Sequence, residues 1–79
     1  MKADETLDCV GLYCPMPIAN TANKLKKLEV GQVLEVLADD EGIKEDMPAW
    51  CRTTGNEYLG LEEEKDIIKV YVRKKNNEE

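Results

Sequence analysis

The sequence predicts an α+β fold, a two-layer α/β sandwich in which a mixed four-stranded sheet carries two helices on one face. Three observations predict it. Apolar segments with strand and helix periodicity follow one another in the order βαβαββ, and only two of the strand segments are apolar enough for the middle of a sheet. The chain has 79 residues, which suffices for a single core. Right-handed connections then place both helices on the same face.

The first two elements lie on either side of a short loop. Thr6 to Val10 is a short segment with β-branched residues, and it places Leu7 and Cys9 on one face before Gly11 interrupts it. This pattern predicts the first strand. Between Pro15 and Leu28, apolar residues recur at helical spacing and predict the first helix. Its apolar positions are Ile18, Ala22, Leu25 and Leu28.

Three further segments predict the other strands. Residues 33–38 and 67–73 are the most apolar, as expected for strands in the centre of a sheet. Residues 57–62 include Gly60, which suits an edge strand. The polar residues 63–66 have the length of a hairpin loop, so the third and fourth strands should pair as neighbours.

The second helix is predicted in two pieces because a proline lies within its segment. Asp40 offers an N-cap, but Pro48 lacks an amide proton and crowds the preceding turn of a helix that starts at residue 41. We therefore expect a short turn at 41–45 and a new start capped by Asp46, with Pro48 in its first turn. Gly55 should end this helix.

Composition restricts the possible partners and location. Seventeen acidic and eleven basic residues give a net charge of −6, which disfavours direct binding of nucleic acid. No apolar run reaches the roughly 18 residues of a membrane span, and the acidic N-terminus lacks a secretory signal. We expect a cytoplasmic protein without a membrane segment, with residues 1–74 forming one domain and 75–79 a disordered tail.

Cys14 is the candidate reactive group. It stands before Pro15 at the expected start of a helix, where unpaired backbone amides and the helix dipole favour the thiolate. Pro15 and Pro17 both fall in the first turn, where a missing amide proton costs no helical hydrogen bond, and with Gly11 they define the loop that presents the thiol. A helix cap alone would be a poor use of cysteine, because Ser, Thr, Asp and Asn cap better.

The other candidate residues have structural alternatives. Cys9 and Cys51 fall on inward faces and are expected in the core, although Cys9 is near enough in sequence to be a resolving thiol for Cys14. Met16, Asp39 and Asp40 are candidate contacts for a partner protein, with gap filling and helix capping as their alternative roles. Three cysteines without a histidine make a metal site unexpected.

The chain resembles the TusA/SirA-like sulfur carriers, whose hallmark is a CPxP motif after the first strand. Three segments in order carry the resemblance: residues 7–17, with Cys14-Pro15-Met16-Pro17 at their end, residues 36–40 and residues 46–51. The resemblance implies the strand order 1-2-4-3. It also implies that Cys14 accepts a sulfane sulfur from a donor protein, holds it as a persulfide and passes it to an acceptor protein.

The predicted carrier depends on other proteins. The sequence contains no histidine base, glycine-rich phosphate loop or lysine-bearing cofactor motif, so no cofactor is expected. A donor of the desulfurase or rhodanese type and a separate acceptor are implied, with a monomer that forms transient complexes. tRNA thiolation, cofactor biosynthesis and sulfur oxidation are all open as pathways. The alternatives are a thiol-disulfide redox module using Cys9 and Cys14, and a noncatalytic regulatory or binding domain.

Overall fold

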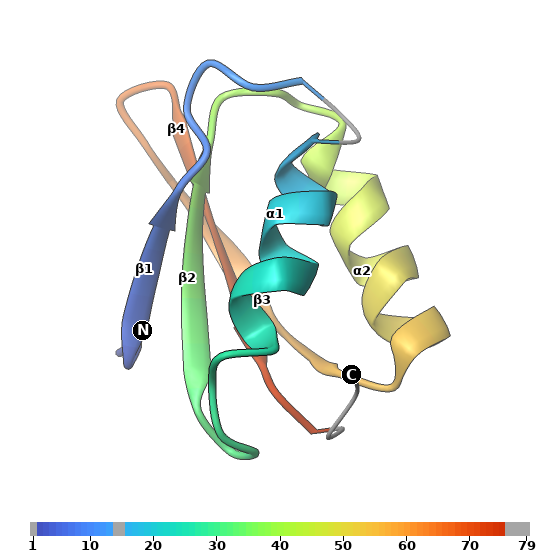
Figure 1. The fold of residues 1–79 in the computed structure, drawn as a ribbon. Coiled ribbons are helices and arrows are strands. Elements are labelled where there is room, and N and C mark those ends of the chain that lie inside the picture. Colours follow the sequence, from blue (N-terminus) through green and yellow to red (C-terminus); the bar gives the residue numbers. More distant parts are fainter. Residues whose placement is uncertain (1, 14–15, 76–79) are drawn as a thin grey trace.

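The computed structural model describes residues 2–13 and 16–75, which form a four-stranded sheet covered on one face by two helices (Figure 1). β1 pairs parallel with β2, whereas β4 pairs antiparallel with both β2 and β3, giving the order β1-β2-β4-β3. The predicted fold class is therefore confirmed, with β2 and β4 in the centre. The elements are β1 (Glu5–Asp8), α1 (Met16–Leu25), β2 (Val33–Ala38), α2 (Ile43–Thr54), β3 (Glu57–Glu64) and β4 (Ile67–Arg73).

The core lies between the sheet and the two helices. Alternate residues of β2 and their partners on β4 point to the helices, as the two-residue period of a strand requires. α2 adds side chains spaced by four residues, which fall on one face of a helix. These buried residues are Leu34, Val36 and Ala38 on β2, Ile68, Val70 and Val72 on β4, and Ile43, Met47 and Cys51 on α2.

β1 ends at Asp8, two residues before the predicted end, and the reason is a local hydrogen bond. The Cys9 amide still donates to the Leu37 carbonyl (2.7 Å), which prolongs the ladder by one bond. The Val10 amide instead donates to the Asp8 carboxylate (3.0 Å). Such side-chain bonds compete with strand pairing and turn the backbone away from the sheet.

α1 ends at Leu25, three residues before the predicted end at Leu28. The Lys27 and Leu28 amides donate to carbonyls three residues earlier, at Lys24 and Leu25 (both 3.0 Å). These shorter bonds tighten the last turn, so the chain leaves the α-helix while Leu28 stays buried. The pattern of apolar residues therefore continued beyond the helix.

α2 is one helix, Ile43–Thr54, with Pro48 inside it, so the predicted break and the second start at Asp46 were wrong. A continuous helix keeps Ile43, Met47 and Cys51 on the same face, and all three are at most 1% exposed. Their burial, worth about 1.5–3 kcal/mol for each large side chain, outweighs the roughly 3 kcal/mol that a proline costs inside a helix. Gly55 ends α2 in a left-handed conformation, as predicted.

The β3–β4 hairpin is tighter than the predicted four-residue loop. β3 extends to Glu64, and only Lys65 and Asp66 connect it to Ile67. Both connecting residues have positive φ (51° and 68°), the conformation of a two-residue turn that matches the twist of paired strands. The turn brings Glu64 and Ile67 into register as the last pair of the hairpin.

The face of the sheet away from the helices carries a hydrogen-bonded network around Tyr71. The Tyr71 hydroxyl donates to Glu35 (2.7 Å), and the Thr6 hydroxyl donates to the other oxygen of the same carboxylate (2.9 Å). These bonds, the one from Tyr71 foremost, lower the pKa of Glu35. Tyr71 itself is only 1% exposed and pairs with Gly60 on β3. The network thus stabilises the ionised form of Glu35 in the folded chain.

Tyr71→Phe should destabilise the fold by about 1 kcal/mol at neutral pH, the net value of one hydrogen bond. Because folding lowers the pKa of Glu35, the stability linked to its ionisation is present above the unfolded pKa of about 4.3 and is lost as pH falls through the folded pKa. The difference in the free energy of unfolding between variant and parent should therefore be smaller at pH 3 than at pH 7. Urea unfolding at pH 7 and pH 3 measures it, with the exposed Tyr13→Phe as the control. A difference that stays constant with pH would contradict this assignment.

Candidate functional site

The loop between β1 and α1 lies at the end of the sheet where both β1 and β2 finish (Figure 1). Parallel pairing of these strands brings the loop beside Asp39 and Asp40, which follow β2 directly. Cys14 and Pro15 lie outside the described residues. The structure describes the loop up to Tyr13 and the helix from Met16 onward, and these parts define the setting of the candidate thiol.

Backbone hydrogen bonds hold the loop on both sides of Cys14 and Pro15. The Leu12 amide donates to the Cys9 carbonyl (3.1 Å), and the Gly11 amide donates to the Asp39 carboxylate (3.1 Å). Within the motif, the Met16 amide donates to the Tyr13 carbonyl (2.9 Å), which joins the residues on either side of Cys14 and Pro15. The loop is thus tied to itself and to the end of β2.

Gly11 and Pro17 support the loop in different ways. Gly11 has φ +89°, a left-handed conformation that glycine adopts without strain. Pro17 is the second residue of α1 and is fully buried, and its missing amide proton would have had no partner in the first turn. Its carbonyl accepts a hydrogen bond from the buried Thr21 hydroxyl (2.7 Å). The start of α1 is therefore packed into the core.

The adjacent carboxylates Asp39 and Asp40 have separate structural roles. Asp39 is exposed and accepts the hydrogen bond from the Gly11 amide. Asp40 is half-buried, and its side chain accepts a hydrogen bond from the Gly42 amide (3.1 Å) in the turn that leads into α2. The prediction that Asp40 is the N-cap was wrong, because Gly42 is the N-cap of α2 and the helix has no side-chain capping bond. Asp40 instead stabilises the turn that precedes the N-cap. The docking roles of both carboxylates, and of the half-exposed Met16, stay predictions.

Cys9 and Cys51 are free thiols in the core, 0% and 1% exposed. Burial raises the pKa of Cys9, and a hydrogen bond with Asn20 on α1 partly offsets this effect. Burial raises the pKa of Cys51 to about 11. Because the thiolate is the nucleophile, these raised pKa values disfavour reaction at either sulfur at neutral pH. The Asn20 contact was not predicted, since Asn20 lies eleven positions after Cys9 in the sequence.

Comparison with known proteins assigns the family. The fold is similar to the crystal structure of a SirA-like protein from Desulfitobacterium hafniense, with a TM-score of 0.78, 26% identity, and coverage of 91% of this chain and 99% of that one. The family model described as Sulfurtransferase TusA matches residues 5–74. This chain belongs to the TusA family.

Relatives in the TusA family include proteins named as sulfur carriers. YrkF from Bacillus subtilis, named as a candidate sulfur carrier, is 49% identical over 74 residues. The match covers 94% of this chain but only 40% of YrkF. The sulfur carrier protein TusA from Pseudomonas entomophila is 39% identical over 72 residues, covering 91% of this chain and 90% of that protein. The resemblance to the TusA family that the sequence showed is therefore confirmed.

Exposed apolar side chains lie within the TusA-type motif and in the four residues before it. Tyr13 is 75% exposed, Met16 49% and Val10 42%, and among the described residues only Val30 is another large apolar side chain this exposed. Exposed apolar groups gathered in one place are typical of interaction surfaces. Tyr13 and Val10 were missed as candidates, although large apolar residues in a short loop outside any periodic pattern were a usable signal.

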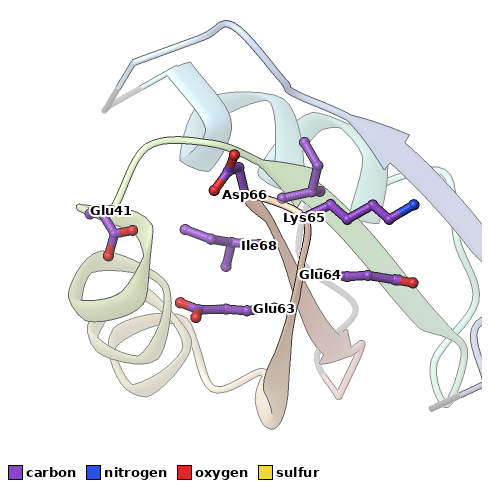
Figure 2. Close-up of a pocket in the computed structure, with 7 residues that line it drawn as sticks. Glu41, Glu63, Glu64, Lys65, Asp66 and Ile68 are labelled. Carbon is purple, nitrogen blue, oxygen red and sulfur yellow. The ribbon is translucent and has the colours of Figure 1, made fainter.

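A second feature of the same end of the sheet is an acidic pocket of about 300 Å³ (Figure 2). Lys44 forms ion pairs with Glu41 (2.8 Å) and Glu63 at this pocket, and these contacts raise the pKa of Lys44 to about 12. Within residues 2–13 and 16–75, no cluster of three or more His, Cys, Asp or Glu could hold a metal ion. The pocket is lined by Glu41, Glu63, Glu64, Lys65, Asp66, Ile67 and Ile68.

Among the described residues, no helix is long and apolar enough to cross a membrane.

Proposed function

We propose that this chain is a sulfur carrier that accepts a sulfane sulfur on Cys14 and delivers it to an acceptor protein. The observation that carries the proposal is the Cys14-Pro15-Met16-Pro17 motif, which follows β1 and runs into the start of α1, in a chain that belongs to the TusA family. Relatives named as sulfur carriers support the same role. The motif residue Cys14 is the reactive group, and Gly11, Pro15 and Pro17 shape the loop that presents it.

The transfer is two thiol exchanges without net oxidation. The Cys14 thiolate attacks the terminal sulfur of a persulfide on the donor, a new S–S bond forms, and the donor cysteine leaves as a thiolate. An acceptor thiolate then attacks the terminal sulfur now held by Cys14, which leaves in turn. The N-terminus of α1, which begins at Met16, favours the anionic sulfur needed for the first step and released in the second.

The partners are proteins that meet the exposed side of the loop. Val10, Tyr13 and Met16 offer apolar contact area there, and Asp39 and Asp40 add negative charge for a basic surface. A donor of the desulfurase or rhodanese type and a separate acceptor would bind in succession. We propose a monomer with transient complexes, because each partner must leave after transfer.

Cys9 is the group on which the competing redox function depends. It is 0% exposed, and burial raises the pKa of its thiol. A resolving cysteine must approach the reactive sulfur closely and react as a thiolate, so this setting favours a structural role for Cys9. A reducing compartment such as the cytoplasm would keep all three thiols free and the Cys14 persulfide exchangeable.

Mass spectrometry tests the function directly. The chain is incubated with a cysteine desulfurase and cysteine, and its intact mass and peptide map are then measured without reductant. We expect a gain of one sulfur atom on the peptide that contains Cys14, removed by dithiothreitol. A loss of two hydrogens on mild oxidation, with no gain of sulfur, would instead support the redox module. Stoichiometric bound zinc with an unreactive Cys14 would support a metal-linked binding domain.

A further inference from the structure

We propose that Asp39 is a positioning residue for Cys14, acting through its hydrogen bond to the backbone amide of Gly11. The bond length is 3.1 Å between the Gly11 nitrogen and the Asp39 Oδ1 atom. The effect of this positioning on sulfur transfer rests on the proposed function, in which Cys14 carries the sulfur. It differs from docking, because the carboxylate acts as an acceptor for the chain's own loop.

Asp39 projects from a rigid base. It follows Ala38, the last residue of β2, which is fully buried. β2 is a central strand, paired with β1 on one side and β4 on the other. A group attached to the end of such a strand has little freedom to move, so it can hold a loop in a fixed place.

Gly11 is exposed, and this bond fixes its backbone amide. It lies three residues before Cys14, and the position where its Cβ would be has no atom within 4 Å outside its chain neighbours. Its positive φ sets the direction of the chain toward the motif. Two hydrogen bonds tie this part of the loop to β2 and its end: the Cys9 amide donates to the Leu37 carbonyl, and the Gly11 amide donates to the Asp39 carboxylate. Without the second bond, the loop would lose its tie to Asp39 three residues before Cys14.

Loss of the bond should affect the reactive sulfur. Cys14 precedes α1 by two residues, and the thiolate is stabilised only when it stays close to the unpaired amides of the first turn. A looser loop would spread Cys14 over positions with weaker stabilisation and poorer alignment for attack on a donor. The negative charge of Asp39 opposes thiolate formation, so its benefit must come from its geometry as an acceptor.

To separate the charge of Asp39 from its role as a hydrogen-bond acceptor, the test compares Asp39→Asn with Asp39→Ala. Asparagine keeps the Oδ1 acceptor and removes the charge, whereas alanine removes both. Asp46→Asn and Asp46→Ala are matched controls, because Asp46 is an exposed residue in the first turn of α2. The readouts are hydrogen exchange of the Gly11 amide, the pH midpoint of Cys14 alkylation by iodoacetamide, and the rate of Cys14 loading by glutathione persulfide.

For Asp39→Ala we expect roughly fivefold faster exchange of the Gly11 amide, the effect of losing one hydrogen bond. Its alkylation midpoint should move upward, and its loading at pH 7 should slow by about three- to tenfold. Asp39→Asn should stay within about twofold of the parent in exchange and loading, with an alkylation midpoint no higher than that of the parent. Both Asp46 variants should match the parent.

Two results would overturn the positioning role. One is Gly11 exchange and Cys14 loading in Asp39→Ala that equal those of the parent. The other is an Asp39→Asn variant as impaired as Asp39→Ala, which would show that charge matters and not the hydrogen bond. If the parent fails to load sulfur, the proposed function fails, yet the Gly11 exchange and the alkylation midpoints still decide whether Asp39 positions the loop.

Discussion

Cys14→Ser should abolish the gain of sulfur completely, which is the largest functional effect expected for any single substitution in this chain. A serine hydroxyl is not ionised at neutral pH and cannot form an exchangeable persulfide, so no other group replaces the lost thiolate. The mass of the variant after incubation with desulfurase and cysteine should equal that of the untreated variant. The parent treated in parallel should gain one sulfur atom.

Cys9→Ala and Cys51→Ala are the matched controls for Cys14→Ser. Both native thiols are buried, and burial raises the pKa of each. Each variant should therefore load sulfur as the parent does when loading is normalised to folded protein. Loading of Cys14→Ser to the parental level would remove Cys14 as the carrier site. A selective loss in Cys9→Ala would point to a thiol relay.

Met47→Ala should lower the free energy of unfolding more than Tyr71→Phe does. Met47 is 0% exposed at the centre of the buried face of α2, between Ile43 and Cys51. Truncating a buried methionine to alanine costs about 2–5 kcal/mol through lost burial and the cavity left behind. A domain of this size is stable by roughly 4–12 kcal/mol, so the variant should be partly unfolded under mild denaturing conditions. Urea unfolding followed by circular dichroism measures the change.

Met16→Ala is the control for Met47→Ala, because it makes the same chemical change at a side chain that is 49% exposed. Its stability should stay within about 0.5 kcal/mol of the parent. Similar losses in the two variants would contradict the burial of the α2 face on which the fold depends. The comparison also checks that α2 is one helix, since only a continuous helix aligns Ile43, Met47 and Cys51 on the sheet.

The fold could be predicted because its central strands are distinctive. β2 and β4 have the same bounds in the structure as in the prediction, since strands covered by helices or by other side chains must be apolar over most of their length. Pro48 misled the prediction because local rules cannot weigh one lost hydrogen bond against the burial of three side chains that lie four residues apart. The ends of β1 and α1 depend on a few local hydrogen bonds, which the spacing of apolar residues does not reveal.

The candidate site could be predicted only in part. Cys14 stands out through its neighbours in sequence, which are local information. The bond between Gly11 and Asp39 joins residues 28 positions apart and arises only when β1 and β2 pair in parallel at a particular register. The same holds for Asn20 beside Cys9, which depends on the packing of α1 against the sheet. Contacts of this kind follow from tertiary structure and have no pattern in the chain.

The most direct test of a nucleophilic Cys14 is the pH dependence of its alkylation in the native chain. Iodoacetamide labelling from pH 5 to pH 10, read by peptide mass spectrometry, gives the midpoint for each thiol. We expect Cys14 to react with a midpoint below about 8.5, the value of an ordinary thiol, because the start of α1 favours its anion. Cys9 and Cys51 should stay unlabelled until the chain is denatured. A Cys14 midpoint at or above that of an ordinary thiol, or labelling of the buried cysteines first, would contradict the carrier role.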